Sequence, residues 1–422
     1  MLVSAIAASD LFAQGGSDTY VQNEIIVRLN QTSDLNAVTQ QYGLSSTPLA
    51  QIGNRPIYRL RVPNGVPVDQ IAGLLQSDPL QRVALAEPNY LLGSPSSNSV
   101  PWAMGGSWSI GGSWSIGGSW SIGSSTKGYA VQWMRGRIEL DAAQAVATGR
   151  NVKIAVLDTG IDPQHPLFAG KLLPGYDFVD NDNDPTEVGS PHVGSYGHGT
   201  HVAGIIAMVA PDAKIIPIRV LDQNGLCDVW RLARALIYAA NPDGDINTND
   251  GADIINLSLG TTQKTTLIRQ LIAAETNDGT APDDPGLPQI GHPGIVIVAS
   301  AGNTGNGTKI YPAAEGEIPG LIAVGASTPY DTVADYSTRG EWIEIMAPGE
   351  RIVSSVPGGR YGIWRGTSMS APVVSGIAAL VHQRFPGLKP IEIFEQIRRT
   401  SVTCSGAITR RVDAGRAVTM AP

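Results

Sequence analysis

The sequence has little cysteine, few aromatic and charged residues, and no long apolar run. Two cysteines among 422 residues, Cys227 and Cys404, are too few for a disulfide framework, and they could form one bridge or stay free. The net charge of -8 provides no basic surface, which argues against nucleic acid as a partner. No apolar stretch is long enough to span a bilayer, so no transmembrane segment is predicted.

Glycine and proline are plentiful, with 49 and 29 residues, as is typical of an α/β enzyme with many tight loops. A chain of this length can hold two or three domains. We interpret residues 1–19 as a leader. Its segment Met1 to Ala13 is weakly apolar and has no basic residue, so it is either the end of a secretion signal that starts upstream or a disordered leader.

Residues 20–93 predict a small α+β unit. Apolar and polar residues indicate strands at 23–29, 57–62 and 83–90, and helices at 34–42 and 66–75. If residues 49–52 add a fourth strand, the order is β-α-β-β-α-β, as in ferredoxin-like modules. The pattern alone does not indicate a function.

Residues 94–130 form a linker without acidic residues, and within it Gly-Gly-Ser-Trp-Ser-Ile occurs three times, from Gly105, Gly111 and Gly117. Trp and Ile fall on every second position, which is strand periodicity. One interpretation is a strand that docks on a sheet edge or on an aromatic-binding partner. The other, which we favour, is a Gly/Ser tether expanded by duplication.

From residue 131 to 422, strands and helices alternate, which predicts an α/β domain with a mostly parallel sheet covered on both faces. Strands are expected at 152–157, 214–220, 253–257, 295–299 and 321–324, and helices at about 201–207, 229–240 and 267–275. Active sites of such sheets form beyond the carboxyl ends of the strands, and Asp158 stands at one such end.

Three further clusters carry reactive side chains. His198 lies between two glycines at a loop-to-helix junction, and Asn303 follows a buried strand. Ser368 opens an apolar helix, where free N–H groups favour developing negative charge, and Pro372 is expected in the first turn of that helix. His198 and His201 could instead ligate a metal, but Gly199 and Thr200 between them leave no glutamate base.

Together these motifs resemble the subtilisin-like serine proteases, the subtilases. The motifs are Asp158-Thr-Gly, His198-Gly-Thr-His, Ala-Gly-Asn303 and Gly-Thr-Ser368-Met-Ser-Ala-Pro, in the family's order Asp, His, Ser. The match runs from about Gln132 to Val418. Residues 20–93, which end in Ala-Glu-Pro-Asn-Tyr, look like the family's inhibitory propeptide, so the chain is expected to carry its own intramolecular inhibitor.

The resemblance implies a subtilisin-like three-layer α/β fold and a serine-protease mechanism without a cofactor for catalysis. Ser368 would be the nucleophile, His198 the base, Asp158 its orienting carboxylate, and Asn303 an oxyanion donor beside the Ser368 N–H. His165, His192 and His201 are interpreted as structural or surface residues.

The same resemblance outlines a cleft for polypeptide substrates. Two segments would clamp an extended peptide by strand addition, namely Gly225, Leu226, Cys227 and Ser258, Leu259, Gly260. Ser300, Ala301 and Gly302 would wall the first specificity pocket, with Ile310 near its back. Either Ile310 points inward and leaves a shallow apolar pocket, or it turns into the core and leaves the pocket deep.

Calcium is the one metal that the sequence suggests. The calcium loop that many relatives carry after the histidine helix is too short here and is expected to be absent. Four carboxylates on one turn resemble a different calcium loop of thermophilic relatives, or else form a solvated acidic turn: Asp177, Asp180, Asp182 and Asp184. A second acidic loop at 243–250 misses the EF-hand spacing.

These observations predict a secreted, monomeric serine endopeptidase made as a zymogen. The alternative from another class is a catalytically silent, peptide-binding pseudo-protease, which should have lost a triad or oxyanion residue; none is lost. An α/β-hydrolase esterase is disfavoured, because residues 366–370 lack the final glycine of Gly-x-Ser-x-Gly and the order of the triad residues differs.

Overall fold

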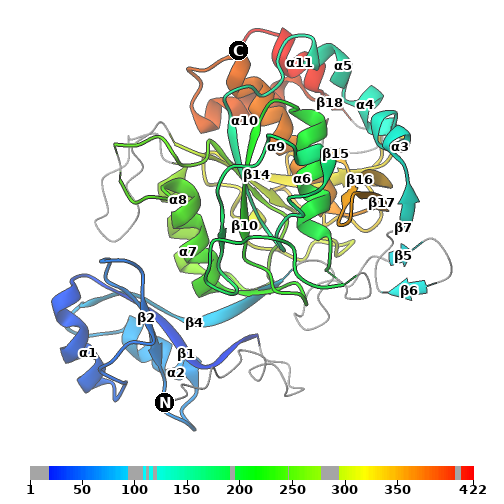
Figure 1. Ribbon diagram of the computed structural model, residues 1–422. Helices are drawn as coiled ribbons and strands as arrows, with labels where there is room; N and C mark the ends of the chain where they lie inside the picture. Colours follow the sequence, from blue (N-terminus) through cyan, green and yellow to red (C-terminus); the bar gives the residue numbers. More distant parts are fainter. Residues whose placement is uncertain are drawn as a thin grey trace.

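A computed structural model describes residues 19–93, 108–110, 114–116, 121–190, 195–245, 247–276, 294–403 and 410–422. The segment Met1 to Ala13, most of the linker, His192 and Cys404 lie outside these residues. The described chain forms a small N-terminal unit, which packs beside helices α7 and α8 of a larger α/β unit (Figure 1).

The small unit is an antiparallel sheet with two helices on one face, as predicted. Its elements are β1 (Tyr20–Leu29), η2 (Thr32–Asp34), α1 (Leu35–Gln41), β2 (Ala50–Gln51), β3 (Ile57–Arg61), α2 (Val68–Gln76) and β4 (Val83–Gly93). The strand order β4-β1-β3-β2 is that of a ferredoxin-like fold. The element order β-α-β-β-α-β is therefore confirmed.

Alternation along β1 explains why this unit is held by the larger one. Ile25 and Val27 point to the side of the small unit's own helices and pack in a core with Leu75. Ile26, between them, belongs instead to the core that contains Trp230 of the larger unit. Successive strand residues face opposite sides, so both faces of the sheet are apolar and both are covered.

The larger unit is built on a nine-stranded sheet of order β18-β19-β15-β14-β13-β12-β8-β10-β9. Its strands are β8 (Lys153–Asp158), β9 (Tyr176–Asp177), β10 (Lys214–Arg219), β12 (Ile254–Leu257), β13 (Val296–Ser300), β14 (Leu321–Ser327), β15 (Ile345–Pro348), β18 (Val402–Thr403) and β19 (Arg410–Arg411). Every pair is parallel except β18 with β19. The predicted parallel sheet is confirmed.

Helices cover both faces of this sheet. One core contains residues of α6 (His198–Val209), α9 (Thr367–Arg384), α10 (Pro390–Thr400) and α11 (Ala414–Thr419). The other contains residues of α7 (Val229–Ala240) and α8 (Thr266–Glu275). The shorter helices are α3 (Thr126–Ala130), α4 (Trp133–Arg137), α5 (Leu140–Gln144), η3 (Pro166–Phe168) and η4 (Ala313–Glu315). Among the described residues, no helix combines the length and apolar character needed to cross a membrane.

The hexapeptide repeats supply three short strands. β5 (Trp108–Ile110) and β6 (Trp114–Ile116) pair with each other, and β7 (Ser121–Ser124) pairs antiparallel with β17 (Arg360–Trp364) beside β16 (Ile352–Val356). The last two residues of the third repeat, Ser121 and Ile122, therefore pair on a sheet edge, as the first interpretation expects and the favoured Gly/Ser tether does not. The alternating pattern of the repeat and the open edge of β17 together allow the pairing.

Candidate active site

The candidate base and its carboxylate come from neighbouring elements. Asp158 is the last residue of β8, and His198 is the first residue of α6. His198 Nδ1 lies 2.7 Å from Asp158 Oδ1, and that oxygen also accepts the Thr159 N–H at 2.8 Å. Both side chains are buried. His198 Nε2 has no hydrogen-bond partner within the described part of the chain, so it remains available to a nucleophile.

This contact depends on the glycine after the histidine. A Cβ placed on Gly199 would lie 2.1 Å from Gly160 O and 3.1 Å from Asp158 Cβ. Any side chain at this position would therefore push the first turn of α6 away from the end of β8. Gly199 is what allows His198 to reach Asp158.

Ser368, the candidate nucleophile, lies in the first turn of α9 and is 2% exposed. Its Oγ donates a hydrogen bond to Ser258 O at 3.4 Å, so its hydroxyl is turned toward the end of β12. Catalytic hydrogen bonds are often long or misaligned without substrate, and a rotation about the Cα–Cβ bond of Ser368 would redirect the hydroxyl.

One prediction about this helix is wrong. Pro372 is the sixth residue of α9 and not part of its first turn. In a regular helix its N–H would bond to Ser368 O, and proline has no N–H. The Ser258 hydroxyl replaces that donor, at 3.0 Å from Ser368 O. Ser258 therefore ties the carbonyl of the candidate nucleophile to the end of β12.

The amide of Asn303 is held in one orientation. Its Oδ1 accepts the Thr367 N–H at 2.9 Å and the Thr367 hydroxyl at 3.0 Å, and the same hydroxyl oxygen accepts the Gly302 N–H at 3.1 Å. With Oδ1 occupied by two donors, Nδ2 is the end left to donate. This is the orientation that an oxyanion donor beside Ser368 requires.

The two predicted cleft segments hold the end of the N-terminal unit. Leu226–Asp228 form β11, which pairs antiparallel with Leu91–Gly93 of β4. On the other side, Gly93 and Gly260 exchange two backbone hydrogen bonds of 3.2 Å. The tail of β4 thus lies between the segments in the extended form expected of a bound peptide. Ser258, Leu259, Leu226 and Cys227 are all buried.

Two polar residues of β4 anchor this tail on helix N-termini. The Glu87 carboxylate accepts the N–H groups of Thr266 at 2.7 Å and Leu267 at 3.1 Å, at the start of α8. Asn89 Oδ1 accepts the Trp230 N–H at 3.0 Å, at the start of α7. Burial raises the pKa of Glu87 to about 7, against the opposing effect of its two hydrogen bonds.

Ile310 lies between the pocket walls. It is fully buried, and a Cβ added to Gly260 or to Gly302 would lie 2.6 Å from one of its side-chain carbons. It also packs against Leu226. Ser300 and Ala301, before Gly302, are buried at the end of β13. Ile310 thus contacts both predicted pocket walls, and the depth of the pocket stays a prediction.

Cys227 is a free, buried thiol beside the β4 tail. Burial is the main cause that raises its pKa to about 12, so the thiol stays protonated at neutral pH. His201, in α6 three residues after His198, is also buried, stacks on Trp364 with 4.7 Å between ring centroids, and has its pKa lowered to about 3, mainly by burial. His165 Nε2 contacts Arg360 O at 2.9 Å, and Nδ1 accepts the Leu167 N–H. Both histidines are structural, as interpreted from the sequence.

The four carboxylates of the predicted calcium loop are engaged by other groups. Arg219 binds Asp177 at 2.5 Å and Asp180 at 2.6 Å, and backbone N–H groups of the loop bind Asp177, Asp182 and Asp184. Of the residues described, no group of three or more His, Cys, Asp or Glu is placed to hold a metal. In the acidic loop at 243–250, Asp243 and Asp245 accept hydrogen bonds from its own backbone. The carboxylate oxygens of the Asp177–Asp184 loop are suitable ligands for Ca²⁺, and calcium binding there stays a prediction.

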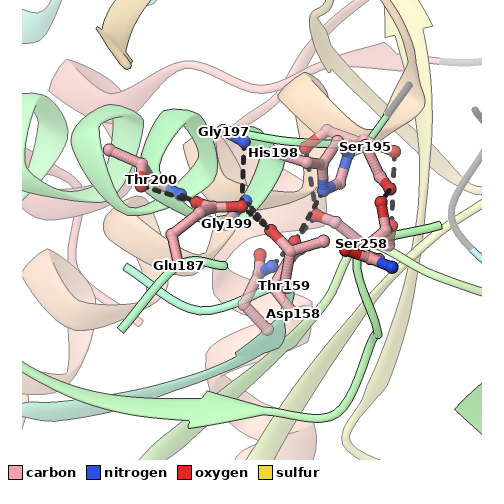
Figure 2. Close-up of polar contacts among 12 residues, drawn as sticks. Asp158, Thr159, Glu187, Ser195, Gly197, His198, Gly199, Thr200 and Ser258 are labelled. Atoms are coloured by element: carbon pink, nitrogen blue, oxygen red, sulfur yellow. Dashed lines mark hydrogen bonds and ion pairs between the residues drawn. The ribbon is translucent and has the colours of Figure 1, made fainter. Parts of the chain in front are cut away.

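The sequence reasoning missed one buried carboxylate at this site, Glu187. It lies in the loop between β9 and α6 and accepts hydrogen bonds from Thr159, Gly197 and Thr200 around the Asp158–His198 contact (Figure 2). The loop has no repeat, periodicity or motif that marks one of its acidic residues. Only the folded chain identifies it.

Comparison with known proteins agrees with this geometry. The profile of the Subtilase family matches residues 149–417, and the profile of the Fervidolysin N-terminal prodomain matches residues 6–89. A "Thermophilic serine proteinase" of Bacillus sp. (strain AK1) is 33% identical over 418 residues, which cover 95% of this chain and 88% of that protein. "Thermitase" of Thermoactinomyces vulgaris is 35% identical over 296 residues, 67% of this chain and 94% of that protein.

Solved structures show the same fold. Fervidolysin from Fervidobacterium pennivorans, described as a keratinolytic enzyme related to subtilisin, aligns with a TM-score of 0.70 and 24% identity. The alignment covers 95% of this chain and 61% of the fervidolysin chain, so this chain spans about three fifths of that protein. A cold-adapted subtilisin-like serine proteinase aligns with a TM-score of 0.52 and 28% identity over 64% of this chain and 90% of that protein.

Proposed function

The chain belongs to the subtilase family and is a subtilisin-like serine protease with a prodomain, and from that premise we propose that it is a secreted endopeptidase made as a zymogen. Ser368, His198 and Asp158 act as its triad. The observation that carries this proposal is the buried 2.7 Å contact between His198 Nδ1 and Asp158 Oδ1 at the end of β8. Ser368, in the first turn of α9, bonds to Ser258 O just after β12, the strand that pairs with β8.

The reaction begins when Ser368 Oγ attacks the carbonyl carbon of a peptide bond. His198 Nε2 takes the hydroxyl proton as the new C–O bond forms, and Asp158 stabilises the imidazolium. The carbonyl oxygen becomes an oxyanion, which accepts hydrogen bonds from Asn303 Nδ2 and the Ser368 N–H. The fixed Oδ1 of Asn303 supports this assignment, because it directs Nδ2 away from Thr367.

Collapse of the oxyanion breaks the C–N bond. His198 gives its proton to the departing amine, which leaves an acyl group on Ser368 Oγ. Water then attacks the acyl carbon, gives a proton to His198, and releases the carboxylic acid as Ser368 regains its hydrogen. No step of this reaction requires a cofactor.

The zymogen proposal rests on the tail of β4. Residues 20–93 form the prodomain, residues 131–422 the catalytic domain, and Leu91–Gly93 lie where a substrate would pair with both cleft segments. An occupied cleft excludes other polypeptides, so the prodomain inhibits the enzyme until it is removed. Calcium, if bound, would be held by the carboxylates of Asp177, Asp180, Asp182 and Asp184, two of which it would share with Arg219.

Expression of Ser368→Ala in a protease-deficient host tests the proposal. The variant should accumulate as an unprocessed chain and should not react with a serine-directed phosphonate, whereas the wild type is processed and labelled. Ser370→Ala is the matched control, because Ser370 is also buried and its hydroxyl donates to Ala347 O, away from the triad residues. Normal processing of Ser368→Ala would contradict the proposal.

A further inference from the structure

The first turn of α6 has no cap of its own. A helix begins with N–H groups that lack partners inside the helix, and the residue before the first turn usually supplies a side-chain acceptor. In α6 that residue is Gly197, which has no side chain. Yet this turn carries His198, so the position of its backbone decides where the imidazole lies.

Glu187 supplies the missing acceptors from a separate loop. Its Oε1 accepts the Gly197 N–H at 2.8 Å, and its Oε2 accepts the Thr200 N–H at 3.1 Å and the Thr200 hydroxyl at 2.6 Å. The His198 N–H goes to Ser195 O at 3.1 Å. The carboxylate therefore binds backbone N–H groups before and after His198.

The same carboxylate reaches the strand that carries the aspartate. Glu187 Oε1 also accepts the hydroxyl of Thr159, the residue after Asp158, and Thr159 Oγ1 in turn accepts the Gly199 N–H at 2.9 Å. One chain of hydrogen bonds thus joins the residue after Asp158 to the residue after His198. Figure 2 shows Glu187 and Thr159 below the first turn of α6, on the side of Asp158.

We propose that Glu187 is a positioning residue of the reaction: it caps α6 in place of Gly197 and sets the distance between the end of β8 and His198. This inference rests on the proposed function, because it assigns Glu187 a part in orienting the same triad. Glu187 does not touch substrate. It acts through Thr159, Gly197 and Thr200, which hold the backbone of Asp158 and His198.

The donors around Glu187 require a carboxylate. The two threonine hydroxyls already accept backbone N–H groups, from Gly199 on Thr159 and from Asp162 on Thr200, so their protons point to Glu187. An amide could accept at one of its ends only and would direct its NH₂ group at other donors. The negative charge is also favourable at a helix N-terminus and beside an imidazolium.

Several titratable groups surround this carboxylate. Burial raises the pKa of Glu187 to about 7, and Asp158 raises it further, while the hydrogen bonds from Thr159, Thr200 and Gly197 lower it. Burial, and then Glu187 itself, raises the pKa of Tyr196. His198 and His201 lie in the same turn, and burial lowers the pKa of His201 to about 3. A change at Glu187 should therefore be visible in the pH dependence of turnover.

Glu187→Gln is the test, with Glu275→Gln as its matched control. Glu275 is fully buried in α8 of the same unit and carries none of the contacts described here. We expect Glu187→Gln to lower kcat on a small peptide substrate by about 10- to 100-fold with KM within about threefold, because a misplaced base slows chemistry without removing a substrate contact. The acid limb of its kcat/KM profile should move to lower pH. Glu275→Gln should change neither.

Stability is measured separately, in a Ser368→Ala background that prevents autolysis. If Glu187→Gln does not fold, Thr159→Val replaces it, since this substitution removes one hydroxyl from the chain of hydrogen bonds and keeps the volume. Thr159→Val should also lower kcat, by a smaller factor than Glu187→Gln. This inference would be overturned if the wild type is active and Glu187→Gln has the same kcat and pH profile as the wild type. If only Thr159→Val folds, an unchanged kcat and pH profile in that variant would overturn it. A wild type that neither turns over substrate nor takes up a phosphonate would overturn the proposed function.

Discussion

Replacement of Ile310 by glycine should change which side chain the protease prefers before the scissile bond. Ile310 is fully buried, and its two branches approach the Cβ positions of Gly260 and Gly302 to 2.6 Å. Its side chain therefore fills the space between the pocket walls. The wild type should favour Ala, Val, Leu or Met over Phe and Tyr. No carboxylate lies in the segments that form this pocket, so a basic side chain should also be disfavoured.

The size of the change follows from the volume removed. Ile310→Gly deletes four carbon atoms, and each methylene buried by a substrate contributes about 0.8 kcal/mol. The upper limit is about 3 kcal/mol, and imperfect filling should leave about 2 kcal/mol, or about 30-fold in the ratio of kcat/KM for Phe over Ala substrates. Deletion of a buried isoleucine should also cost about 2–5 kcal/mol of the free energy of unfolding, so the assay belongs well below the melting temperature.

The assay compares two peptide substrates that differ only in the residue before the scissile bond. Ile310→Val, which removes one methyl group, should shift the ratio in the same direction by a smaller factor. A series from isoleucine through valine to glycine separates pocket depth from loss of stability, because both substrates experience the same destabilised enzyme. A wild type that already prefers Phe, with a ratio that neither substitution changes, would refute the pocket assignment.

Three further predictions concern the oxyanion, the acidic loop and the prodomain. Asn303→Ala should lower kcat by about 10²–10³, the loss typical of one oxyanion donor in a subtilisin, with little change in KM; a variant within threefold of wild type would exclude Asn303 as a donor. If the Asp177–Asp184 loop binds Ca²⁺, a chelator should lower the melting temperature of the wild type but not that of Asp180→Ala/Asp182→Ala. If the chelator does not change the melting temperature of the wild type, the loop is a solvated acidic turn. Because burial raises the pKa of Glu87 to about 7 in the docked prodomain, the docked form holds an extra proton between pH of about 4.5 and 7. Docking should therefore weaken as pH rises from about 4.5 to about 7 and change little above that. Glu87→Gln should flatten this trend in size-exclusion chromatography of the cleaved complex, and an equal pH dependence in both proteins would contradict the role of Glu87.

The sequence predicted the sheet well because its strands are continuous apolar runs that end at polar residues. β8 ends at Asp158, where the run Ile154–Leu157 meets the first carboxylate. Both helices of the small unit were also predicted, because their apolar residues recur with helical spacing. Patterns of this kind depend only on neighbours in the chain, and they are therefore visible without a structure.

Contacts between distant residues could not be predicted in this way. Ser258 and Ser368 are 110 residues apart, and nothing in either motif indicates that one hydroxyl replaces the helix bond lost at Pro372. Glu187 is a similar case, since its role depends on a long loop that returns to Gly197. The resemblance to a family supplied the triad, but it could not supply a residue outside the shared motifs.

β11 illustrates a third limit, because its existence depends on its partner. Leu226–Asp228 are hydrogen-bonded as a strand only to β4 in the described sheets, so the catalytic unit presents them as an unpaired edge once the prodomain leaves. An edge of this kind accepts any extended polypeptide, which makes the inhibitory tail and the substrate competitors for one set of backbone groups. Cleavage of a single peptide bond beyond Gly93 would not empty that edge. Glu87 and Asn89 would still hold β4 on α8 and α7, and Ile26 would remain in the shared core. Under the zymogen mechanism proposed above, activation requires the loss of these anchors as well, through dissociation or digestion of the prodomain, so processing and activation would be separate steps.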